Sequence, residues 1–325
     1  MTPEFRMIET NGIRVRAAMQ GEGPLVVMVH GFPESWYSWR HQMAPLAAAG
    51  FSVCAIDVRG YGGSDKPHAA EAYSMANMTA DVAGVIDALS PGAPAVVIGH
   101  DWGAPIAWLT AVLHPGKVRG VAGLSVPYYA LPPAPLSHIF KAMFTDQGKF
   151  FYMAYFQQEG VAEAEFEADV RGALRRLYYA ASADADGRWG GGDKPVGEPM
   201  LQGLPDPDPF PPWLTPADID YFVSEFERSG FRGPINRYRN FERDWAMMSG
   251  VTDRIIHQPS LFIAGANDMV LKMFGDGSAD TLVANMQAVL SDFRGARIVP
   301  NCGHWTQQEA PDATTGHLID WLATL

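Results

Sequence analysis

The sequence predicts an α/β fold in which a mostly parallel β-sheet is flanked by helices and an inserted helical lid lies above one edge of the sheet. Three observations support this prediction. Short apolar runs bounded by turns alternate with segments of helical periodicity, which is typical of parallel strands covered on both faces. The alternation stops between about Tyr128 and Met248, where aromatic residues and helix formers take over. The 325 residues, 47% of them hydrophobic, are enough for one large domain with an insertion.

The N-terminal part predicts a β-hairpin followed by buried strands. A strand, a turn at Asn11 and Gly12 and a second strand are expected in "MIETNGIRVRAAMQ", and a buried strand over residues 25–29. Further strands are expected in "FSVCAIDVRG", "APAVVIGH", "VRGVAGLSVP", "PSLFIAGAND" and "ARIVPNCGHW". Helical periodicity predicts helices within residues 75–89, 104–113 and 312–322.

The break in the alternation predicts the domain boundaries. Residues 1–127 form the first part of the core, residues 128–248 the helical lid and residues 249–325 the second part of the core. Within the lid, residues 181–213 are rich in Gly, Pro and Asp and form a long connector. Such a connector is expected to be either a loop of the lid or partly mobile.

Composition excludes several classes of protein. The net charge of −12 argues against a nucleic-acid-binding surface. The two cysteines have no spacing typical of a metal site or a disulfide framework. The N-terminus lacks an apolar signal core and no apolar run is long enough to cross a bilayer, so a soluble cytoplasmic protein is expected. A homodimer is compatible with this sequence.

The stretch "VIGHDWGAPIAW" carries the strongest chemical signal. An apolar strand leads into a turn in which Gly99 and Gly103 flank Asp101, and a helix follows. Small residues on both sides let the central residue take a strained conformation, as in the nucleophile elbow of hydrolases. The alternative is an aspartate that only caps the next helix. The elbow pattern favours Asp101 as the nucleophile.

An aspartate in this position predicts a reaction different from that of a serine. Serine attack on a saturated carbon would leave an ether, which water does not readily cleave. Carboxylate attack leaves an ester, whose carbonyl carbon is open to water. The carboxylate is also ionised at neutral pH and needs no base to activate it. Asp101 therefore predicts cleavage of a saturated carbon–heteroatom bond through an alkyl-enzyme ester.

Hydrolysis of that ester requires a base that activates water. His304 in "NCGHWTQQEAP" follows the last predicted strand, and Asp268 in "GANDMVL" follows the preceding one and is placed to orient the imidazole. The order nucleophile, acid, histidine is that of the α/β-hydrolase triad. His30 and His100 are expected to form hydrogen bonds within the scaffold instead.

Two backbone N–H groups are expected to form an oxyanion hole. They belong to Phe32 in "HGFPESWYSW" and to Trp102, directly after the nucleophile. Pro33 is a candidate cis-proline in the same turn.

Several blocks together resemble the epoxide hydrolases of the α/β-hydrolase fold. These blocks are "HGFPESWYSWR", "GYGGSDKP", "GHDWGAP", "YFQQEGVAEAE", "SGFRGPINRYRN" and "GHWTQQEAP", in that order over nearly the whole chain. The resemblance implies conversion of a small apolar epoxide and water into a vicinal diol, without cofactor or metal. It also implies two lid tyrosines that protonate the epoxide oxygen, Tyr155 in "YFQQ" and Tyr238 in "RYRN". Tyr152 lies at helical spacing from Tyr155.

One position departs from the pattern of this family. Arg237 stands directly before Tyr238, where an aromatic or apolar residue is expected, and either changes the polarity of the pocket or points outward. Two rival functions stay open at this point, a haloalkane dehalogenase and an inactive hydrolase fold that serves as a receptor. The physiological epoxide and the stereochemistry do not follow from the sequence.

Overall fold

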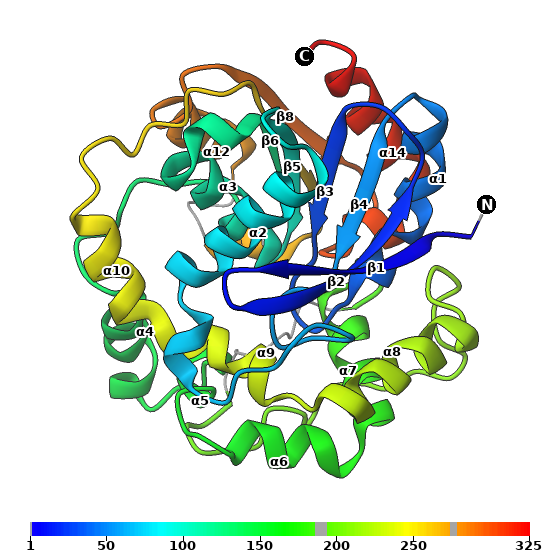
Figure 1. Cartoon of the computed structure of the whole chain (residues 1–325). Coiled ribbons are helices and arrows are strands. Elements are labelled where there is room, and N and C mark those ends of the chain that lie inside the picture. The colour runs from blue at the N-terminus through cyan, green and yellow to red at the C-terminus, as the bar shows by residue number, and fades with distance from the viewer. Residues whose placement is uncertain (1, 186–193, 274–277) are drawn as a thin grey trace.

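The computed structural model describes residues 2–185, 194–273 and 278–325, and over these ranges eight strands form one twisted sheet (Figure 1). The strand order is β1-β2-β4-β3-β5-β6-β7-β8. Only the pairings of β1 with β2 and of β2 with β4 are antiparallel, so the prediction of a mostly parallel sheet is confirmed. The strands are β1 Glu4–Thr10, β2 Ile13–Gln20, β3 Leu25–Val29, β4 Ser52–Ile56, β5 Ala95–His100, β6 Val118–Leu124, β7 Ser260–Gly265 and β8 Phe293–Val299.

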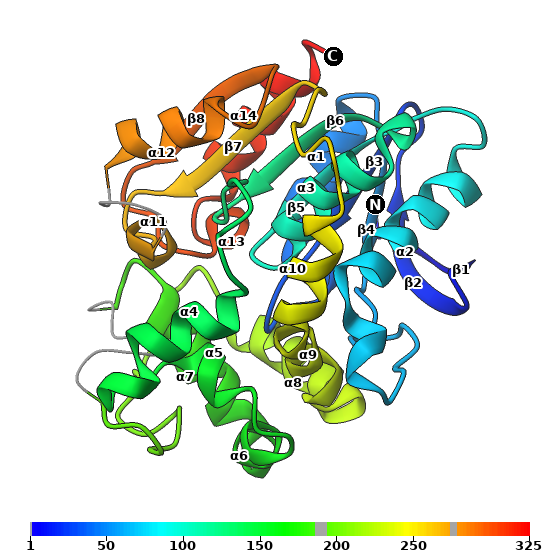
Figure 2. The ribbon, with the colours of Figure 1, turned by 90° about the vertical axis from the view of Figure 1, so that its left-hand side faces the viewer.

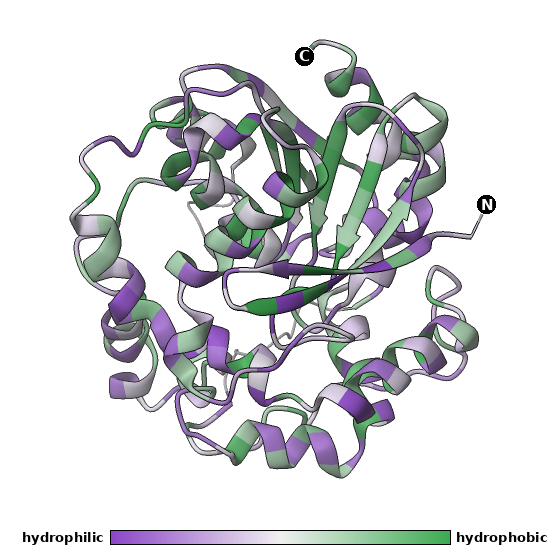
Figure 3. Cartoon of the chain, in the orientation of Figure 1, coloured by the Kyte–Doolittle hydropathy of each residue, from purple (hydrophilic) through white to green (hydrophobic). Residues whose placement is uncertain are grey.

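Both faces of the sheet are covered by helices, which explains why its central strands are mainly apolar (Figure 3). Alternate residues of β3 enter different cores: Val27 packs on the side of α2 and α3, and Val26 on the side of α1 and α14. The helices of the core are α1 Arg40–Ala48, α2 Met75–Leu89, α3 Gly103–Leu113, α11 Met269–Met273, α12 Ala279–Gln287, α13 Thr306–Glu309 and α14 Pro311–Leu322, with 3₁₀ turns η1 Trp36–Trp39, η2 Ala70–Tyr73 and η3 Pro115–Lys117.

The segment between β6 and β7 is helical and lies on one side of the sheet (Figures 1 and 2). The sequence marks where α8 begins. This helix starts with a capping box between Thr215 and Asp218, with Pro216 in the first turn. These elements are α4 Leu136–Met143, η4 Thr145–Gln147, α5 Tyr152–Tyr155, α6 Val161–Ala168, α7 Val170–Ala181, α8 Pro216–Ser229, α9 Arg232–Asn236, η5 Arg237–Asn240 and α10 Phe241–Ser249.

Part of the predicted connector, residues 186–193, lies outside the described residues. Ala181 ends α7, and residues 182–185 and 194–213 contain no helix, but Pro195 forms an isolated bridge with Lys149. Across residues 2–185, 194–273 and 278–325, no helix is both long and apolar enough to cross a membrane.

Candidate active site

The turn between β5 and α3 holds Asp101 in a left-handed backbone conformation, with φ at +49°. Such a conformation is uncommon for a residue with a side chain and is typical of functional turns. The turn closes only because the flanking residues are small: a Cβ on Gly99 would lie 1.9 Å from the carbonyl oxygen of Gly103. The result is a sharp strand–turn–helix at the carboxyl edge of the sheet.

The loops after β7 and β8 bring an acid and a histidine to this turn. His304 Nε2 lies 3.4 Å from Asp101 Oδ2, and His304 Nδ1 lies 3.1 Å from Asp268 Oδ1. The Asp268 side chain is fully buried, whereas that of Asp101 is 16% exposed. The imidazole is therefore held between two carboxylates, and of the two only Asp101 is open to a small molecule.

The turn after β3 supplies a donor to the same carboxylate. The Phe32 N–H donates to Asp101 Oδ1 at 2.7 Å, and the Phe32–Pro33 peptide bond is cis. Trp102 precedes α3, and its ring meets that of Tyr238 edge-on at 5.0 Å. A donor already placed at one oxygen of Asp101 is suited to stabilise negative charge there.

The charges around His304 set its protonation. Burial alone would lower the pKa of His304, but the charge of Asp268 and the hydrogen bonds to Asp101 and Asp268 outweigh it and raise the pKa well above the ordinary value. An imidazolium between two carboxylates is therefore favoured in the free protein.

A second histidine holds the backbone of the first. His100 Nε2 donates to the carbonyl oxygen of His304 at 2.7 Å, and His100 Nδ1 lies 2.8 Å from Glu34 Oε2. Burial would raise the pKa of Glu34, but the charge of His100 and the hydrogen bond from it lower the pKa to about 2. Both ring nitrogens of His100 therefore face acceptor oxygens, one on Glu34 and one on the backbone of His304. His30 also bonds within the scaffold, to Gly31 and Val58, as predicted.

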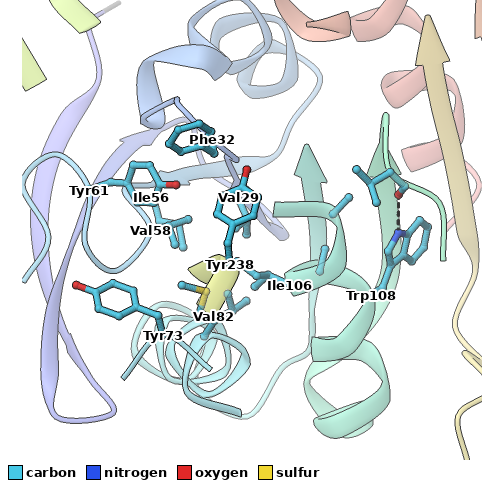
Figure 4. Close-up of a cluster of buried hydrophobic side chains, with 14 of the residues drawn as sticks. Val29, Phe32, Ile56, Val58, Tyr61, Tyr73, Val82, Ile106, Trp108 and Tyr238 are labelled. Carbon is cyan, nitrogen blue, oxygen red and sulfur yellow. Dashed lines mark hydrogen bonds between the residues drawn. The ribbon is translucent and has the colours of Figure 1, made fainter. Parts of the chain in front are cut away.

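Tyr238 of η5 lies in a cluster of buried hydrophobic side chains that includes Phe32 and Val29 (Figure 4). It is 2% exposed, and its ring meets those of Phe32 at 5.6 Å and Phe156 at 4.9 Å. Burial, and then the charge of Asp101, raise the pKa of Tyr238 well above the ordinary value. The phenol thus keeps its proton next to a carboxylate.

Tyr155 does not lie with these residues in the way the sequence predicts. Its hydroxyl donates to Glu165 Oε2 at 2.8 Å, and the same carboxylate accepts the backbone N–H groups of Met200 and Leu201. The Tyr155 ring packs on Phe150 at 5.5 Å. The hydrogen bond of Tyr155 therefore links α5 to α6, and Glu165 links both to the segment before α8. The hydroxyl proton of Tyr155 is donated to Glu165.

Tyr152, one turn earlier on α5, occupies the place expected for Tyr155. It is 6% exposed, and its ring lies 6.0 Å from that of Tyr238. The structure therefore places Tyr152, and not Tyr155, beside Tyr238, in contrast to the expectation from the sequence. The two tyrosines belong to the same short helix, so the sequence alone does not separate them.

Arg237 is buried and does not point outward. It is 2% exposed, its guanidinium lies 4.8 Å above the Trp102 ring, and it donates to Asp244 and to the carbonyl oxygen of Tyr73. Burial lowers the pKa of Arg237 to about 9. Among the described residues nothing accepts a hydrogen bond from its Nε.

A mainly apolar cavity of about 120 Å³ lies beside Trp102, between α3 and the lid helices α4 and α10. Leu109, Tyr128, Leu136 and Phe241 are among its lining residues, and Arg237 contributes a polar part of the wall. A space of this size and polarity suits an apolar substituent of a small molecule.

Comparison with known proteins gives full-length matches. Residues 24–311 match the model of the alpha/beta hydrolase fold family. Epoxide hydrolase A of Mycobacterium tuberculosis is 38% identical, with 99% of this chain and 98% of the relative covered. Among solved structures, an epoxide hydrolase from an endophytic Streptomyces has a TM-score of 0.92 at 44% identity, covering 99% of this chain and 96% of that chain. Epoxide hydrolase A from Mycobacterium thermoresistibile has a TM-score of 0.91 at 40% identity, covering 99% and 98%.

Proposed function

The chain belongs to the epoxide hydrolases of the α/β-hydrolase fold, and from this premise we propose that Asp101 is the nucleophile, His304 with Asp268 the water-activating pair, and Tyr238 with Tyr152 the acids. The observation that carries the proposal is the convergence of Asp101, His304 and Asp268 beneath a buried tyrosine. The matches to epoxide hydrolases favour this chemistry over dehalogenation.

In the first step, Asp101 attacks a ring carbon of the epoxide. Asp101 Oδ2 forms the new C–O bond, the C–O bond of the ring breaks, and the departing oxygen takes a proton from a phenol. The alkoxide is a poor leaving group, so a proton donor at this oxygen is essential. The raised pKa of Tyr238 supports this role, because the phenol holds its proton until negative charge develops. The matches to epoxide hydrolases support an epoxide as substrate. The apolar cavity borders the site at Trp102, and its lining does not include the proposed nucleophile, base or acids.

In the second step, His304 takes a proton from water, and the hydroxide attacks Cγ of the Asp101 ester. The oxyanion develops on Oδ1, where the Phe32 N–H already donates, and Trp102 is proposed to supply the second N–H. The tetrahedral intermediate then releases the diol, which takes up the proton from His304. The proton left on the Asp101 carboxylic acid returns to the phenolate formed in the first step. One oxygen of the diol therefore comes from Asp101, and the carboxylate is rebuilt with an oxygen from water.

Ester formation prepares His304 for its role as base. The hydrogen bond to Asp101 and the charge of Asp101 are two of the causes that raise the pKa of His304. Alkylation neutralises this carboxylate, so the pKa of His304 falls and neutral imidazole becomes more populated. Asp268 keeps the ring oriented throughout.

The proposal is tested with His304→Gln. This variant keeps the nucleophile and the tyrosines but lacks the base, so it is expected to accumulate the ester after addition of styrene oxide. Intact-protein mass spectrometry should show an increase equal to the mass of the epoxide, whereas Asp101→Asn should show none. An unmodified His304→Gln protein that still turns over would overturn the mechanism.

A further inference from the structure

The loop that carries His304, residues 300–305, is joined to the lid as well as to the core. The His304 N–H donates to the carbonyl oxygen of Ala181 at 3.0 Å, and the Trp305 indole donates to that of Tyr178 at 2.7 Å. Both acceptors belong to the last turn of lid helix α7. Gly303 permits the approach, because a Cβ there would lie 2.3 Å from the backbone nitrogen of Ala183.

One carboxylate accepts hydrogen bonds from both the His304 loop and the segment that follows α7. Glu309, the last residue of α13, accepts from the backbone N–H groups of Gly303 and Ala183 with Oε2, each at 2.9 Å. Its Oε1 accepts from the N–H of Trp305, also at 2.9 Å. The Glu309 carboxylate therefore accepts hydrogen bonds from the residues on either side of His304 and from the segment that follows α7.

We propose that Glu309 is a positioning residue for the epoxide hydrolase reaction: it fixes His304 for ester hydrolysis by fastening its loop to lid helix α7. The inference rests on the proposed function, because it requires His304 to act as base on the Asp101 ester. Glu309 touches neither His304's side chain nor the reacting atoms; it acts through the backbone on both sides of the histidine.

The charge and the two oxygens of Glu309 are both needed for this role. Hydrogen bonds to an ionised acceptor are stronger than those between neutral groups. A glutamine has one acceptor oxygen and one NH₂ group. Whichever way its amide turned, the NH₂ would face an N–H donor, either that of Trp305 or those of Gly303 and Ala183. Glu309→Gln therefore loses either the hydrogen bond to Trp305 or those to Gly303 and Ala183.

The two chemical steps should respond differently to this release. Ring opening depends on Asp101 and the tyrosines, whereas hydrolysis of the ester depends on the placement of His304. In single-turnover experiments with styrene oxide, Glu309→Gln is expected to slow ester hydrolysis by about 10- to 100-fold and ring opening by less than about 3-fold, since small displacements of a catalytic group have effects of this size. Ester should accumulate at steady state, detected by intact-protein mass spectrometry.

Glu225→Gln is the matched control. Glu225 is also a buried glutamate, 2% exposed, but it pairs with Arg16 and Arg228. Among the described residues it forms no hydrogen bond or ion pair with the His304 loop. Glu225→Gln is expected to lower thermal stability without changing the ratio of the rate of ring opening to the rate of ester hydrolysis. Equal slowing of both steps in Glu309→Gln, or an unchanged ratio, would overturn the inference.

Glu309→Asp provides a second variant if the glutamine variant folds poorly. It keeps the charge but is one methylene shorter, so hydrolysis should be slowed less than in Glu309→Gln and still more than ring opening. Failure of the proposed function gives a different result, because His304→Gln would then form no ester at all. Ester formation in His304→Gln together with an unchanged ratio in both Glu309 variants would overturn only the role of Glu309.

Discussion

At the scale of single residues, the two oxygens of Asp101 have different surroundings before any substrate binds. Oδ1 accepts the Phe32 N–H at 2.7 Å, and Oδ2 lies 3.4 Å from His304 Nε2. In the proposed mechanism, the oxygen in the first contact carries the oxyanion and the oxygen in the second contact attacks the epoxide. A fixed donor of this kind costs no reorganisation during the reaction.

The two tyrosines of α5 give the sharpest prediction at this scale. Tyr152→Phe is expected to slow ring opening by about 100-fold or more, because it removes a general acid. Tyr155→Phe is expected to change ring opening by less than about 3-fold, since its hydroxyl is bonded to Glu165 and not to the reacting group. The measurement is the rate of ester formation under single-turnover conditions. A large loss in Tyr155→Phe with little loss in Tyr152→Phe would restore the assignment made from sequence.

The difference between Tyr152 and Tyr155 shows what sequence can decide about single residues. The strained backbone at Asp101 could be predicted because small residues flank it, and the structure confirms this conformation. Tyr152 and Tyr155 are chemically identical and three residues apart, so only the partner of each hydroxyl separates them. That partner, Glu165, comes from another helix, and its contact with Tyr155 depends on how α5 and α6 pack.

At the scale of elements, Glu34 joins the ends of three of them. It follows β3, pairs with His100 at the end of β5, and accepts from the side chains of Gln307 and Gln308 on α13. Its side chain is fully buried, and Oε2 also accepts the Gly31 N–H. The loop ends that carry the proposed nucleophile and base are thus held by one buried ion pair.

This ion pair predicts a pH-dependent stability. The lowering of the Glu34 pKa from 4.5 to about 2 corresponds to about 3 kcal/mol. Because the pKa is depressed in the folded state, this contribution is complete above pH 4.5 and is lost as the pH falls towards 2. Glu34→Gln should therefore unfold at lower urea concentration at pH 7, and its difference from the parent protein should shrink between pH 4.5 and 2.

Glu22→Gln is the control for this experiment, because Glu22 is exposed. It should match the parent protein at every pH. A Glu34→Gln difference that stayed constant down to pH 2 would contradict the ionised pair.

The elements themselves were largely predictable. Buried strands with apolar residues on both faces and helices such as Met75–Leu89 have patterns that local packing dictates. The short lid elements were not, because α5 has four residues and α9 five, too few for a periodic signal. Their conformation depends on the core against which they lie.

At the scale of the whole molecule, the lid is fixed to the core by buried polar contacts. Arg237 donates to the carbonyl oxygen of Tyr73, and Asp244 accepts the N–H of Met75 at 2.8 Å. Asn240 donates to the carbonyl oxygen of Ala70 at 2.7 Å. These contacts hold η5, and with it Tyr238, against the segment that leads into α2. Arg237 is visible in the sequence as a departure from the family pattern, but its contacts could not be predicted, because its partners lie on both sides of the lid–core boundary.

The pair of Arg237 and Asp244 predicts an unequal response to single and double substitution. Asp244→Asn leaves a guanidinium that is 2% exposed without its counter-charge, which should cost about 3–5 kcal/mol of unfolding free energy. Replacing both residues by leucine removes the buried charge as well, so the double variant should be more stable than Asp244→Asn, although its volume differs. Urea unfolding of the parent protein, Arg237→Leu, Asp244→Leu and the double leucine variant measures the coupling, and Asp244→Asn is measured beside them. Asp220→Asn serves as control, because its ion pair with Arg171 is exposed and is expected to contribute less than about 1 kcal/mol. An Asp244→Asn protein as stable as this control would show that the lid is held by its apolar contacts alone.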